Sequence, residues 1–509
     1  MSGRVVMLQG TMSSVGKSLL VAALCRICKQ DGWRVAPFKA QNMALNSYAT
    51  SDGREVGRAQ AMQAAAAGIE VTVEMNPVLL KPEADAQAQV VVLGRPWTRL
   101  TAREYYAHKR DLWPVVTGAL DHLRAQYDLV IIEGAGSPVE LNLKRGDLVN
   151  MAVATYAHAP VLLVGDIDRG GIFAQLLGTL LLLEEHERQL VRGLIVNKFR
   201  GDVSLFEAGV ELLEQRGGVP VLGVVPFLRD LGLADEDSVA LDDLGPTPTA
   251  PNALTIAVIR LPHISNFDDF DPLRAEPGVS VRFVEHPADL DGADLLILPG
   301  TKTTVADLRW LHERGLAAAL LAQVQAGTPL LGICGGYQML GTAIYDPDGS
   351  ESAVPEVAGL GLLPIVTYFQ QAKQTLRADG QVVAPVGLFA AARGRVCTGY
   401  EIHMGRTVLL EGALPLLQIT QRGGQPTSDS DGATRADGRV AGTYLHGLFE
   451  QDELRHTLLA SLAAHRNVAH PPNWSRFDRE AQYDRLAAAV RATLDLDALY
   501  QILNVRGTG

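Results

Sequence analysis

Short apolar runs recur along the chain, and most of them end at a glycine, an acid or an amide residue. In the first half these runs occupy residues 5–8, 129–132, 160–164, 194–196 and 221–225. Short runs of this kind are typical of strands that are buried on both faces of a parallel sheet. Between them lie stretches with helical spacing, such as 18–26 and 102–124. The pattern therefore predicts alternating strands and helices, and with them a doubly wound α/β domain.

A second series of apolar runs begins at residue 254 and predicts a second domain of the same class. Its members occupy residues 254–259, 295–298 and 329–333, and a further strand is predicted over residues 442–446. Residues 241–252 contain three prolines without apolar periodicity, which indicates a linker. We therefore predict two doubly wound parallel-sheet domains, over residues 1–240 and 253–509, joined by this linker.

Composition and charge narrow the class of partner. The chain has 509 residues, of which 47% are hydrophobic, and a formal net charge of −12. Because Lys and Arg form no clustered runs, we expect no nucleic-acid partner and look instead to small molecules or proteins. Four cysteines are too few for a disulfide framework, and no apolar run approaches the roughly 18 residues of a membrane span. We expect a cytoplasmic protein without a membrane partner.

A glycine-bounded loop separates the first predicted strand from the first predicted helix. Its sequence is Gly10-Thr-Met-Ser-Ser-Val-Gly16-Lys17-Ser18. The backbone N–H groups of such a loop form, with the helix N-terminus, a cradle for phosphate oxygens. We expect Gly10, Thr11 and Gly16 to shape the cradle. Lys17 would neutralise phosphate charge and Ser18 would hold Mg²⁺, although five residues rather than four separate the two glycines.

Charged residues that follow other predicted strands extend this site. Glu133 ends the run 129–132, and Asp52 lies in the polar stretch that follows Lys39. Because the carboxyl ends of parallel strands meet at one edge of a sheet, we expect Glu133 and Asp52 to join Ser18 around Mg²⁺. Glu133 as a water-holding acid and Asp52 as a solvated loop residue are the alternatives. Lys39 would bind phosphate or an acid substrate.

Two further strand ends carry polar side chains. Asp166 and Asp168 are two residues apart on an extended segment, so they would point the same way and suit a metal or an amide nitrogen. Asn197 and the lysine after it resemble the base-reading motif of GTPases, but Arg200 stands where that motif has aspartate. We therefore expect Asn197 to contribute to an adenine nucleotide site.

A cysteine in the second half has the surroundings of a nucleophile. Cys334 lies between a predicted strand and a predicted helix, in the sequence Gly332-Ile-Cys-Gly-Gly, where small neighbours permit a strained turn. Backbone N–H groups of Gly335 and Gly300 would receive an oxyanion. Such a cysteine needs a base, and His446 ends the last predicted strand. His403 is a rival, which we interpret as structural or substrate-facing.

These motifs together resemble two known enzyme groups. The loop at Gly10 is similar to that of the dethiobiotin synthetase group of phosphate-loop enzymes. The Pro299-Gly-Thr turn, the cysteine elbow and the late histidine resemble class I glutamine amidotransferases. With the stretches Lys39-Ala-Gln-Asn-Met-Ala-Leu-Asn-Ser, Glu133-Gly-Ala-Gly-Ser-Pro, Asp166-Ile-Asp-Arg-Gly-Gly and Val196-Asn-Lys-Phe-Arg-Gly-Asp, nearly the whole chain resembles the cobyric acid synthase family.

The resemblance implies a specific reaction. In this family ATP, with Mg²⁺, activates the b, d, e and g carboxylates of adenosylcobyrinic acid a,c-diamide, and ammonia from L-glutamine converts them to amides. On this chain it implies that Lys17 and Ser18 serve ATP and Mg²⁺, that Cys334 attacks glutamine and that His446 moves its proton. It leaves open whether the chain forms a homo-oligomer.

One position departs from most class I amidotransferases. Leu448 stands two residues after His446, where a glutamate usually orients the histidine. A backbone carbonyl, a water or an acid elsewhere, such as Glu450, would take that role. Two other functions stay open: the sister cobyrinic acid a,c-diamide synthase, and a ParA/MinD-like ATPase with an inactive amidotransferase fold. Gly10-Thr11 lacks the lysine that the latter ATPases carry at the start of the loop.

Overall fold

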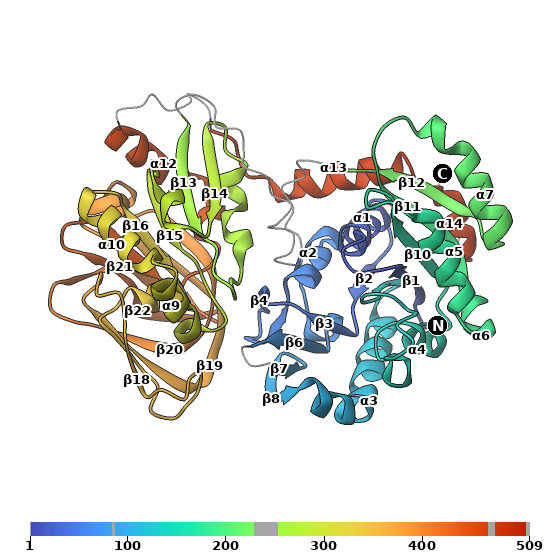
Figure 1. Ribbon diagram of the computed structural model, residues 1–509, viewed down its shortest axis with the longest axis horizontal. Coiled ribbons are helices and arrows are strands. Elements are labelled where there is room, and N and C mark those ends of the chain that lie inside the picture. Colours follow the sequence, from blue (N-terminus) through green and yellow to red (C-terminus); the bar gives the residue numbers. More distant parts are fainter. Residues whose placement is uncertain (1, 84–86, 229–252, 467–473, 505–509) are drawn as a thin grey trace.

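The protein forms two α/β lobes that lie side by side (Figure 1). The computed structural model describes residues 2–83, 87–228, 253–466 and 474–504. The predicted linker, residues 241–252, lies outside the described residues. Both lobes are built on sheets whose central strands are parallel, which confirms the predicted fold class.

A six-stranded parallel sheet forms the centre of the first lobe. Its strands, in spatial order, are β12 (Val221–Pro226), β11 (Val191–Phe199), β10 (Val161–Asp166), β1 (Arg4–Gly10), β9 (Leu129–Glu133) and β2 (Val35–Phe38). Alternate side chains of β1 enter different cores, because Val5 and Met7 pack on one face while Val6 and Leu8 pack on the other. The strand order reverses around β1, and ligands of such sheets bind at this point, beyond the carboxyl ends of the strands.

Helices cover both faces of this sheet. Those drawn from the first half of the chain are α1 (Lys17–Gln30), α2 (Arg58–Ala67), α3 (Ala102–Gln126), α4 (Met151–Ala157), α5 (Ile172–Leu182), α6 (Glu185–Arg188) and α7 (Glu207–Gly217). Two small sheets lie beside them: β3 (Gln41–Met43), β6 (Val78–Pro82), β7 (Gln87–Val92) and β8 (Arg95–Thr101), and the hairpin of β4 (Ser47–Ala49) and β5 (Glu55–Gly57).

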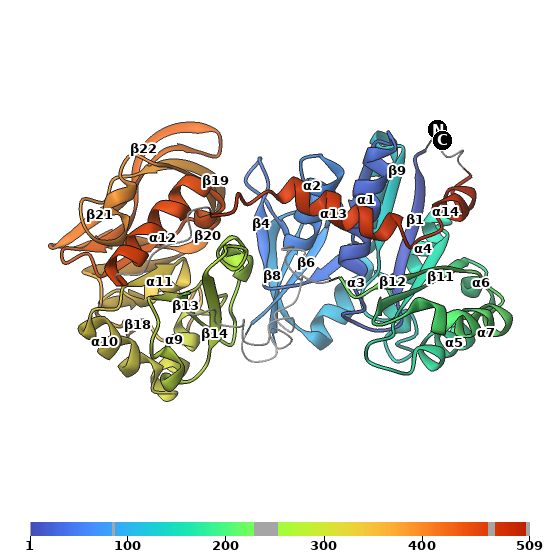
Figure 2. The ribbon, with the colours of Figure 1, turned by 90° about the horizontal axis from the view of Figure 1, so that it is seen from above.

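The end of the chain returns to the first lobe. Helices α13 (Arg479–Arg491) and α14 (Leu496–Ile502) pack in the same core as α1, and Figure 2 shows α13 lying across α1. Arg26 of α1 holds α13 in place, since it contacts Glu480 and Asp484 at 2.7 Å each. The range 253–509 therefore supplies helices to both lobes.

The second lobe is built on a mixed sheet of eleven strands. Five neighbouring strands are parallel: β14 (Val279–Val284), β13 (Leu254–Ile259), β15 (Leu295–Leu298), β16 (Leu330–Ile333) and β23 (Val440–Thr443). The sheet continues, largely antiparallel, through β22 (Gln425–Arg435), β21 (Ala413–Arg422), β19 (Ile365–Val382), β20 (Val396–Leu409), β17 (Ala343–Tyr345) and β18 (Glu356–Ala358). Its helices are α8 (Asp271–Arg274), α9 (Thr304–Glu313), α10 (Leu316–Ala326), α11 (Gly335–Met339) and α12 (Asp452–Arg466).

Among the described residues, no helix combines the length and the apolar character that a membrane crossing requires.

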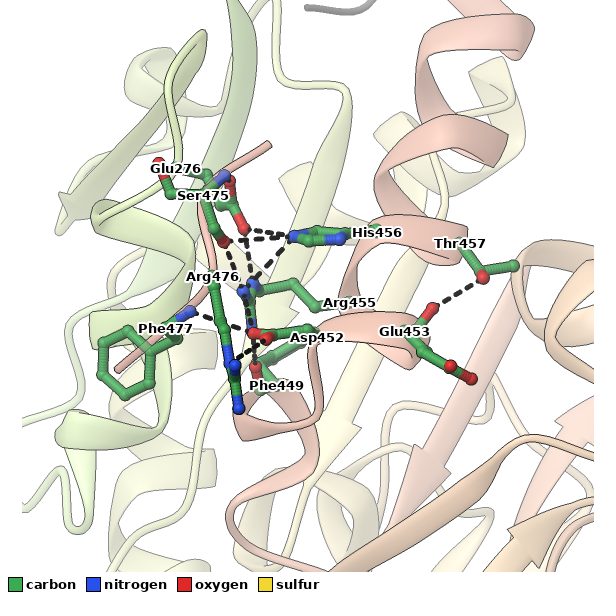
Figure 3. A network of polar contacts seen from close by, with 10 residues as sticks. All are labelled: Glu276, Phe449, Asp452, Glu453, Arg455, His456, Thr457, Ser475, Arg476 and Phe477. Atoms are coloured by element: carbon green, nitrogen blue, oxygen red, sulfur yellow. Dashed lines mark hydrogen bonds and ion pairs between the residues drawn. The ribbon is translucent and has the colours of Figure 1, made fainter. Parts of the chain in front are cut away.

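A buried network secures the point where the chain leaves the second lobe (Figure 3). The side chain of Arg455 is fully buried, and its Nε donates to Glu276 Oε1 at 2.7 Å. Its Nη2 donates both to Asp452 Oδ1 at 2.6 Å and to the Ser475 carbonyl at 3.0 Å. Because Ser475 begins the segment that leads to α13, Arg455 ties this crossing segment to α12.

Replacing Arg455 with methionine is expected to destabilise the chain by about 3–5 kcal/mol, since the buried Glu276 would lose its guanidinium partner and keep only His456 and the Ser475 N–H. Urea unfolding followed by tryptophan fluorescence measures the effect. Arg476→Met is the matched control, because the Arg476 side chain is 86% exposed and approaches Asp452 only to 3.9 Å. Equal losses in the two variants would contradict the role assigned to burial.

Candidate active sites

The predicted nucleophile and base meet at the carboxyl edge of the second sheet. Cys334 directly follows β16, and His446 lies three residues beyond β23, its parallel neighbour. The loops after β13 and β15 contribute Asp269 and Gly300 to the same edge. Four adjacent strands therefore deliver the side chains of one site.

Cys334 occupies a strained turn. Its backbone has φ 52° and ψ −110°, a conformation that residues other than glycine rarely adopt. The turn brings α11 close to β15, because a Cβ added to Gly336 would stand 1.9 Å from the carbonyl oxygen of Leu298. The thiol is buried, and a backbone hydrogen bond of 2.8 Å from its N–H to Thr443 fixes its place beside β23. This is the geometry of a nucleophile elbow.

His446 is held between the thiol and a carboxylate. Its Nδ1 lies 2.7 Å from Asp269 Oδ2, and its ring lies beside the Cys334 thiol, which donates to the Ile402 carbonyl at 3.4 Å. The second oxygen of Asp269 accepts from the Gly447 N–H at 2.8 Å, which fixes the carboxylate. Burial lowers the pKa of His446, but the negative charge of Asp269 and the contact with Cys334 outweigh it and raise the pKa to about 10. The imidazole is therefore set to carry a proton.

Asp269, rather than Glu450, orients the histidine. Glu450 Oε1 instead accepts from Arg479 at 2.7 Å and lies 3.7 Å from Arg58. Analysis of the sequence missed Asp269 because it lies 177 positions before His446. A signal was present, since Asp268, Asp269 and Asp271 follow the strand of residues 254–259 and alternate with phenylalanines.

The two glycines predicted to receive an oxyanion lie in adjoining turns. A Cβ added to Gly335 would stand 3.2 Å from the backbone nitrogen of Thr301, and one added to Gly300 would stand 3.1 Å from His446 Cε1. His403 lines the same site, but its Nδ1 lies 2.7 Å from the Gly405 carbonyl and its ring stacks on Tyr444 at 3.7 Å. Burial lowers the pKa of His403 to about 4, so this ring stays neutral.

Both lobes line the cavity in front of Cys334. The cavity measures about 60 Å³, and its cationic side chains come from the two lobes: Lys81, Arg99, Lys302 and Lys373. A larger space of about 530 Å³ adjoins it and shares Lys373, His403 and Met404. A small polar molecule at Cys334 would therefore be enclosed by charged groups from both lobes.

The predicted phosphate loop lies at the carboxyl end of β1. Lys17 is buried and its Nζ donates to the Met12 carbonyl at 3.2 Å, so the side chain folds back over the loop. This path requires Gly10, because an added Cβ would stand 2.8 Å from Lys17 Nζ. Gly16 adopts φ 93° at the start of α1. Thr11 faces away from the loop interior, since its hydroxyl donates to Gln175 at 3.1 Å and its N–H to the Val164 carbonyl.

Ser18 and Glu133 come together beside Lys17. Ser18 Oγ donates to Glu133 Oε1 at 2.8 Å, and Lys39 Nζ donates to the same oxygen at 2.9 Å. Gln63 of α2 donates to the other oxygen at 2.5 Å. A hydroxyl and a carboxylate at a phosphate cradle are oxygen donors that suit Mg²⁺, which also takes ligands from phosphate and water. Across the described residues, no cluster of three or more His, Cys, Asp or Glu side chains provides a metal site by itself.

Asp52 lies elsewhere. Among the described residues its side-chain partners are Thr50 and Arg54, the latter at 2.6 Å. It sits in the turn of the β4–β5 hairpin, and the neighbouring Gly53 approaches Leu376 of the second lobe. Asp52 therefore lies at the boundary between the lobes and not beside Ser18. The reason is that the polar stretch after Lys39 forms the β4–β5 hairpin, which extends away from the edge of the central sheet.

Side chains after β10 and β11 brace the phosphate loop. Asn197 Nδ2 donates to the Val15 carbonyl at 2.7 Å, and Lys198 Nζ donates to that of Ser14 at 2.7 Å. Lys198 also pairs with the buried Asp166 at 3.0 Å. Asp168 instead pairs with Arg200 at 2.5 Å on the exposed side. The structure thus gives the two aspartates different partners.

Comparisons with known proteins match a domain family to each half of the chain. Residues 6–240 match the family model described as the CobQ/CobB/MinD/ParA nucleotide binding domain. Residues 255–454 match the model of the CobB/CobQ-like glutamine amidotransferase domain. The first range contains the phosphate loop, and the second contains Cys334 and His446.

Curated relatives match over nearly their whole length. The chain is 52% identical over 517 residues to a cobyric acid synthase of Sorangium cellulosum, covering 99% of each chain. It is 56% identical over 495 residues to that of Chloroflexus aurantiacus, covering 97% of this chain and 98% of the relative. It is 55% identical over 490 residues to that of Roseiflexus castenholzii, covering 96% and 98%. The chain therefore belongs to the cobyric acid synthase family of glutamine-hydrolysing, amide-forming ligases of cobalamin biosynthesis.

Proposed function

We propose that this enzyme amidates the b, d, e and g carboxylates of adenosylcobyrinic acid a,c-diamide, using ATP for activation and glutamine as the source of ammonia. The observation that carries this proposal is the Cys334–His446–Asp269 arrangement joined in one chain to a phosphate loop. The full-length similarity to cobyric acid synthases supports the choice of acceptor.

Glutamine is hydrolysed in the second lobe. The Cys334 sulfur attacks the side-chain amide carbon, and the N–H groups of Gly300 and Gly335 stabilise the oxyanion. His446 donates its proton to the departing ammonia, which leaves a thioester on Cys334. Water, deprotonated by His446, then releases glutamate and restores the thiol. Asp269 keeps the Nδ1 proton of His446 in place through both steps.

The carboxylate is activated in the first lobe. Lys17 offsets charge on the phosphates, and the bracing of its loop by Asn197 keeps the cradle formed. Ser18 and Glu133 would hold Mg²⁺, whose positive charge stabilises phosphoryl transfer. Transfer of the γ-phosphoryl group to a corrinoid carboxylate gives an acyl phosphate and ADP; ammonia then displaces phosphate. We assign Lys39, Asp166 and Asp168 to the substrate side of this site, because Lys39 follows β2 and the two aspartates lie at the end of β10, at the same carboxyl edge of the sheet as the phosphate loop.

The acyl phosphate predicts a specific path for oxygen. When the corrinoid carboxylates carry ¹⁸O, each amide formed is expected to move one labelled oxygen into the released phosphate, with ADP as the nucleotide product. Mass spectrometry of phosphate and nucleotide measures both. Label found only in water, or AMP as the product, would contradict activation as an acyl phosphate.

The same assay separates the two candidate acceptors. Cobyrinic acid without its a and c amides is supplied in parallel with the a,c-diamide. Faster turnover of the a,c-diamide, with four amides added, supports the proposed acceptor. Amidation restricted to the a and c groups would assign the chain to the sister reaction instead.

A further inference from the structure

The loop that carries Asp269 is held by the first lobe. The backbone N–H of Asn266 donates to Asn46 Oδ1 at 2.6 Å, and the N–H of Ser47 donates to Asn266 Oδ1 at 3.0 Å. Asn266 adopts a left-handed backbone conformation with φ 54°, which these bonds support. Its Nδ2 lies 3.4 Å from Nε2 of His446. A residue of the first lobe thus stands one contact away from the histidine.

A buried ion pair makes a second connection at the same loop. Arg58, the first residue of α2, contacts Asp268 at 2.6 Å, and the two side chains are 9% and 2% exposed. Asp268 immediately precedes Asp269. The guanidinium also lies over the rings of Tyr48 and Tyr400, at 5.0 and 6.0 Å.

Tyr400 extends this connection to the histidine. Its ring stacks on that of His446 with centroids 5.2 Å apart, and the two residues exchange backbone hydrogen bonds of 2.9 and 3.2 Å. Arg58 therefore reaches His446 by two routes, one through the Asp268–Asp269 peptide and one through Tyr400.

Helix α2 also makes contacts at the nucleotide site. Gln63, five residues after Arg58, donates to Glu133 Oε2 at 2.5 Å and to the Ser18 carbonyl at 3.3 Å. One short helix is thus bonded to the acid beside the phosphate loop and to the loop that orients His446.

We propose that Asn46 and Arg58 are positioning residues for glutamine hydrolysis, and that α2 links this reaction to the nucleotide site. This rests on the roles proposed above for Cys334 and His446. Without Arg58, Asp268 keeps a buried charge with its closest partner lost, and the neighbouring Asp269 moves with it. Displacements of about 1 Å cost on the order of 100-fold in rate, so hydrolysis depends on the docked first lobe.

The first test measures glutamine hydrolysis without nucleotide or corrinoid in Arg58→Met and Asn46→Ala. We expect kcat to fall about tenfold or more, with the KM for glutamine changed less than about threefold, because neither Asn46 nor Arg58 itself lines the cavity at Cys334. Arg58→Lys is expected to recover part of the rate. Ammonia-dependent amidation should stay within about threefold of the unaltered chain, which shows that the variants are folded.

Arg377→Met is the matched control, because Arg377 also joins the lobes and lies over Tyr48, but its ion-pair partner is Glu70. Its rate of glutamine hydrolysis should change less than about twofold. Rates unchanged in both Arg58→Met and Asn46→Ala would overturn the proposal. If Cys334→Ala hydrolysed glutamine at the unaltered rate, the proposed function itself would fail, so the two failures are distinguishable.

The second test addresses the link through α2. The ratio of hydrolysis rates with and without Mg²⁺ and a non-hydrolysable ATP analogue is measured for the unaltered chain and for Gln63→Leu. We expect a ratio above one that falls toward one in the variant, at analogue concentrations that calorimetry shows to be saturating. A ratio of one in the unaltered chain, or an unchanged ratio in Gln63→Leu, would refute the link.

Discussion

Replacing Cys334 with alanine is expected to abolish glutamine-dependent amidation while leaving amidation with ammonium salt at raised pH intact. In the proposed function the Cys334 thiolate frees ammonia from glutamine, whereas the carboxylate is activated at the phosphate loop of the other lobe. The expected loss with glutamine is on the order of 10⁴-fold or more. Product formation with each nitrogen source, followed by mass spectrometry of the corrinoid, measures it.

Two further variants serve as a control and a comparison for Cys334→Ala. Cys397→Ala is the matched control, because Cys397 is also a free, buried cysteine of the second lobe but belongs to β20. Lys17→Ala should lose amidation with both nitrogen sources, since phosphoryl transfer loses electrostatic support worth several kcal/mol. Equal losses with glutamine and ammonium in a folded Cys334→Ala chain would refute the separation of the two reactions.

Asp269→Asn is expected to lower kcat for glutamine hydrolysis by about 10²–10⁴-fold. Asparagine keeps the size of the side chain, but it removes the negative charge that stabilises the imidazolium. Its single acceptor oxygen also cannot accept from both the His446 Nδ1–H and the Gly447 N–H, as the two oxygens of Asp269 do. Steady-state hydrolysis, followed by glutamate release, measures the loss. Because Asn is nearly isosteric with Asp, the fold should tolerate the change.

The pH dependence gives this variant a signature. Burial lowers the pKa of His446, and Asp269 and Cys334 raise it to about 10. The imidazolium is present below this pKa and is lost above it, so activity that needs the proton falls on the alkaline side. Asp269→Asn removes a raising influence, and its alkaline limb should therefore move to lower pH. The profile of kcat/KM for glutamine measures the shift.

Glu450→Gln is the comparison for this profile. Glu450 is an acid on the segment just after His446, but it pairs with Arg479. The alkaline limb of the pH profile of Glu450→Gln should stay where it is in the unaltered chain. A shift in Glu450→Gln together with an unmoved limb in Asp269→Asn would return the orienting role to Glu450.

Much of both sites follows from local sequence. Glu133, Cys334 and His446 each stand at or directly after the end of a predicted strand, and Lys17 and Ser18 close the loop that follows the first strand. In a parallel sheet the carboxyl ends of neighbouring strands meet at one edge, so recognising the strands was enough to expect these residues together. The elbow at Cys334 was likewise visible, because small flanking residues mark the strained turn.

Contacts between distant segments needed the tertiary structure. Asp269 lies in a loop and His446 lies just after a strand, 177 positions later in the sequence. No local pattern distinguishes Asp269 from Asp268 or from Glu450 as the partner of His446. The β4–β5 hairpin carried Asp52 away from the sheet edge for a similar reason, since the path of a polar loop depends on what it packs against. The packing of α13 on α1 also depends on a complementary surface in the other half of the chain. Strand periodicity is set by neighbouring residues, whereas the partner of a buried charge is set by whichever opposite charge the completed fold brings near it.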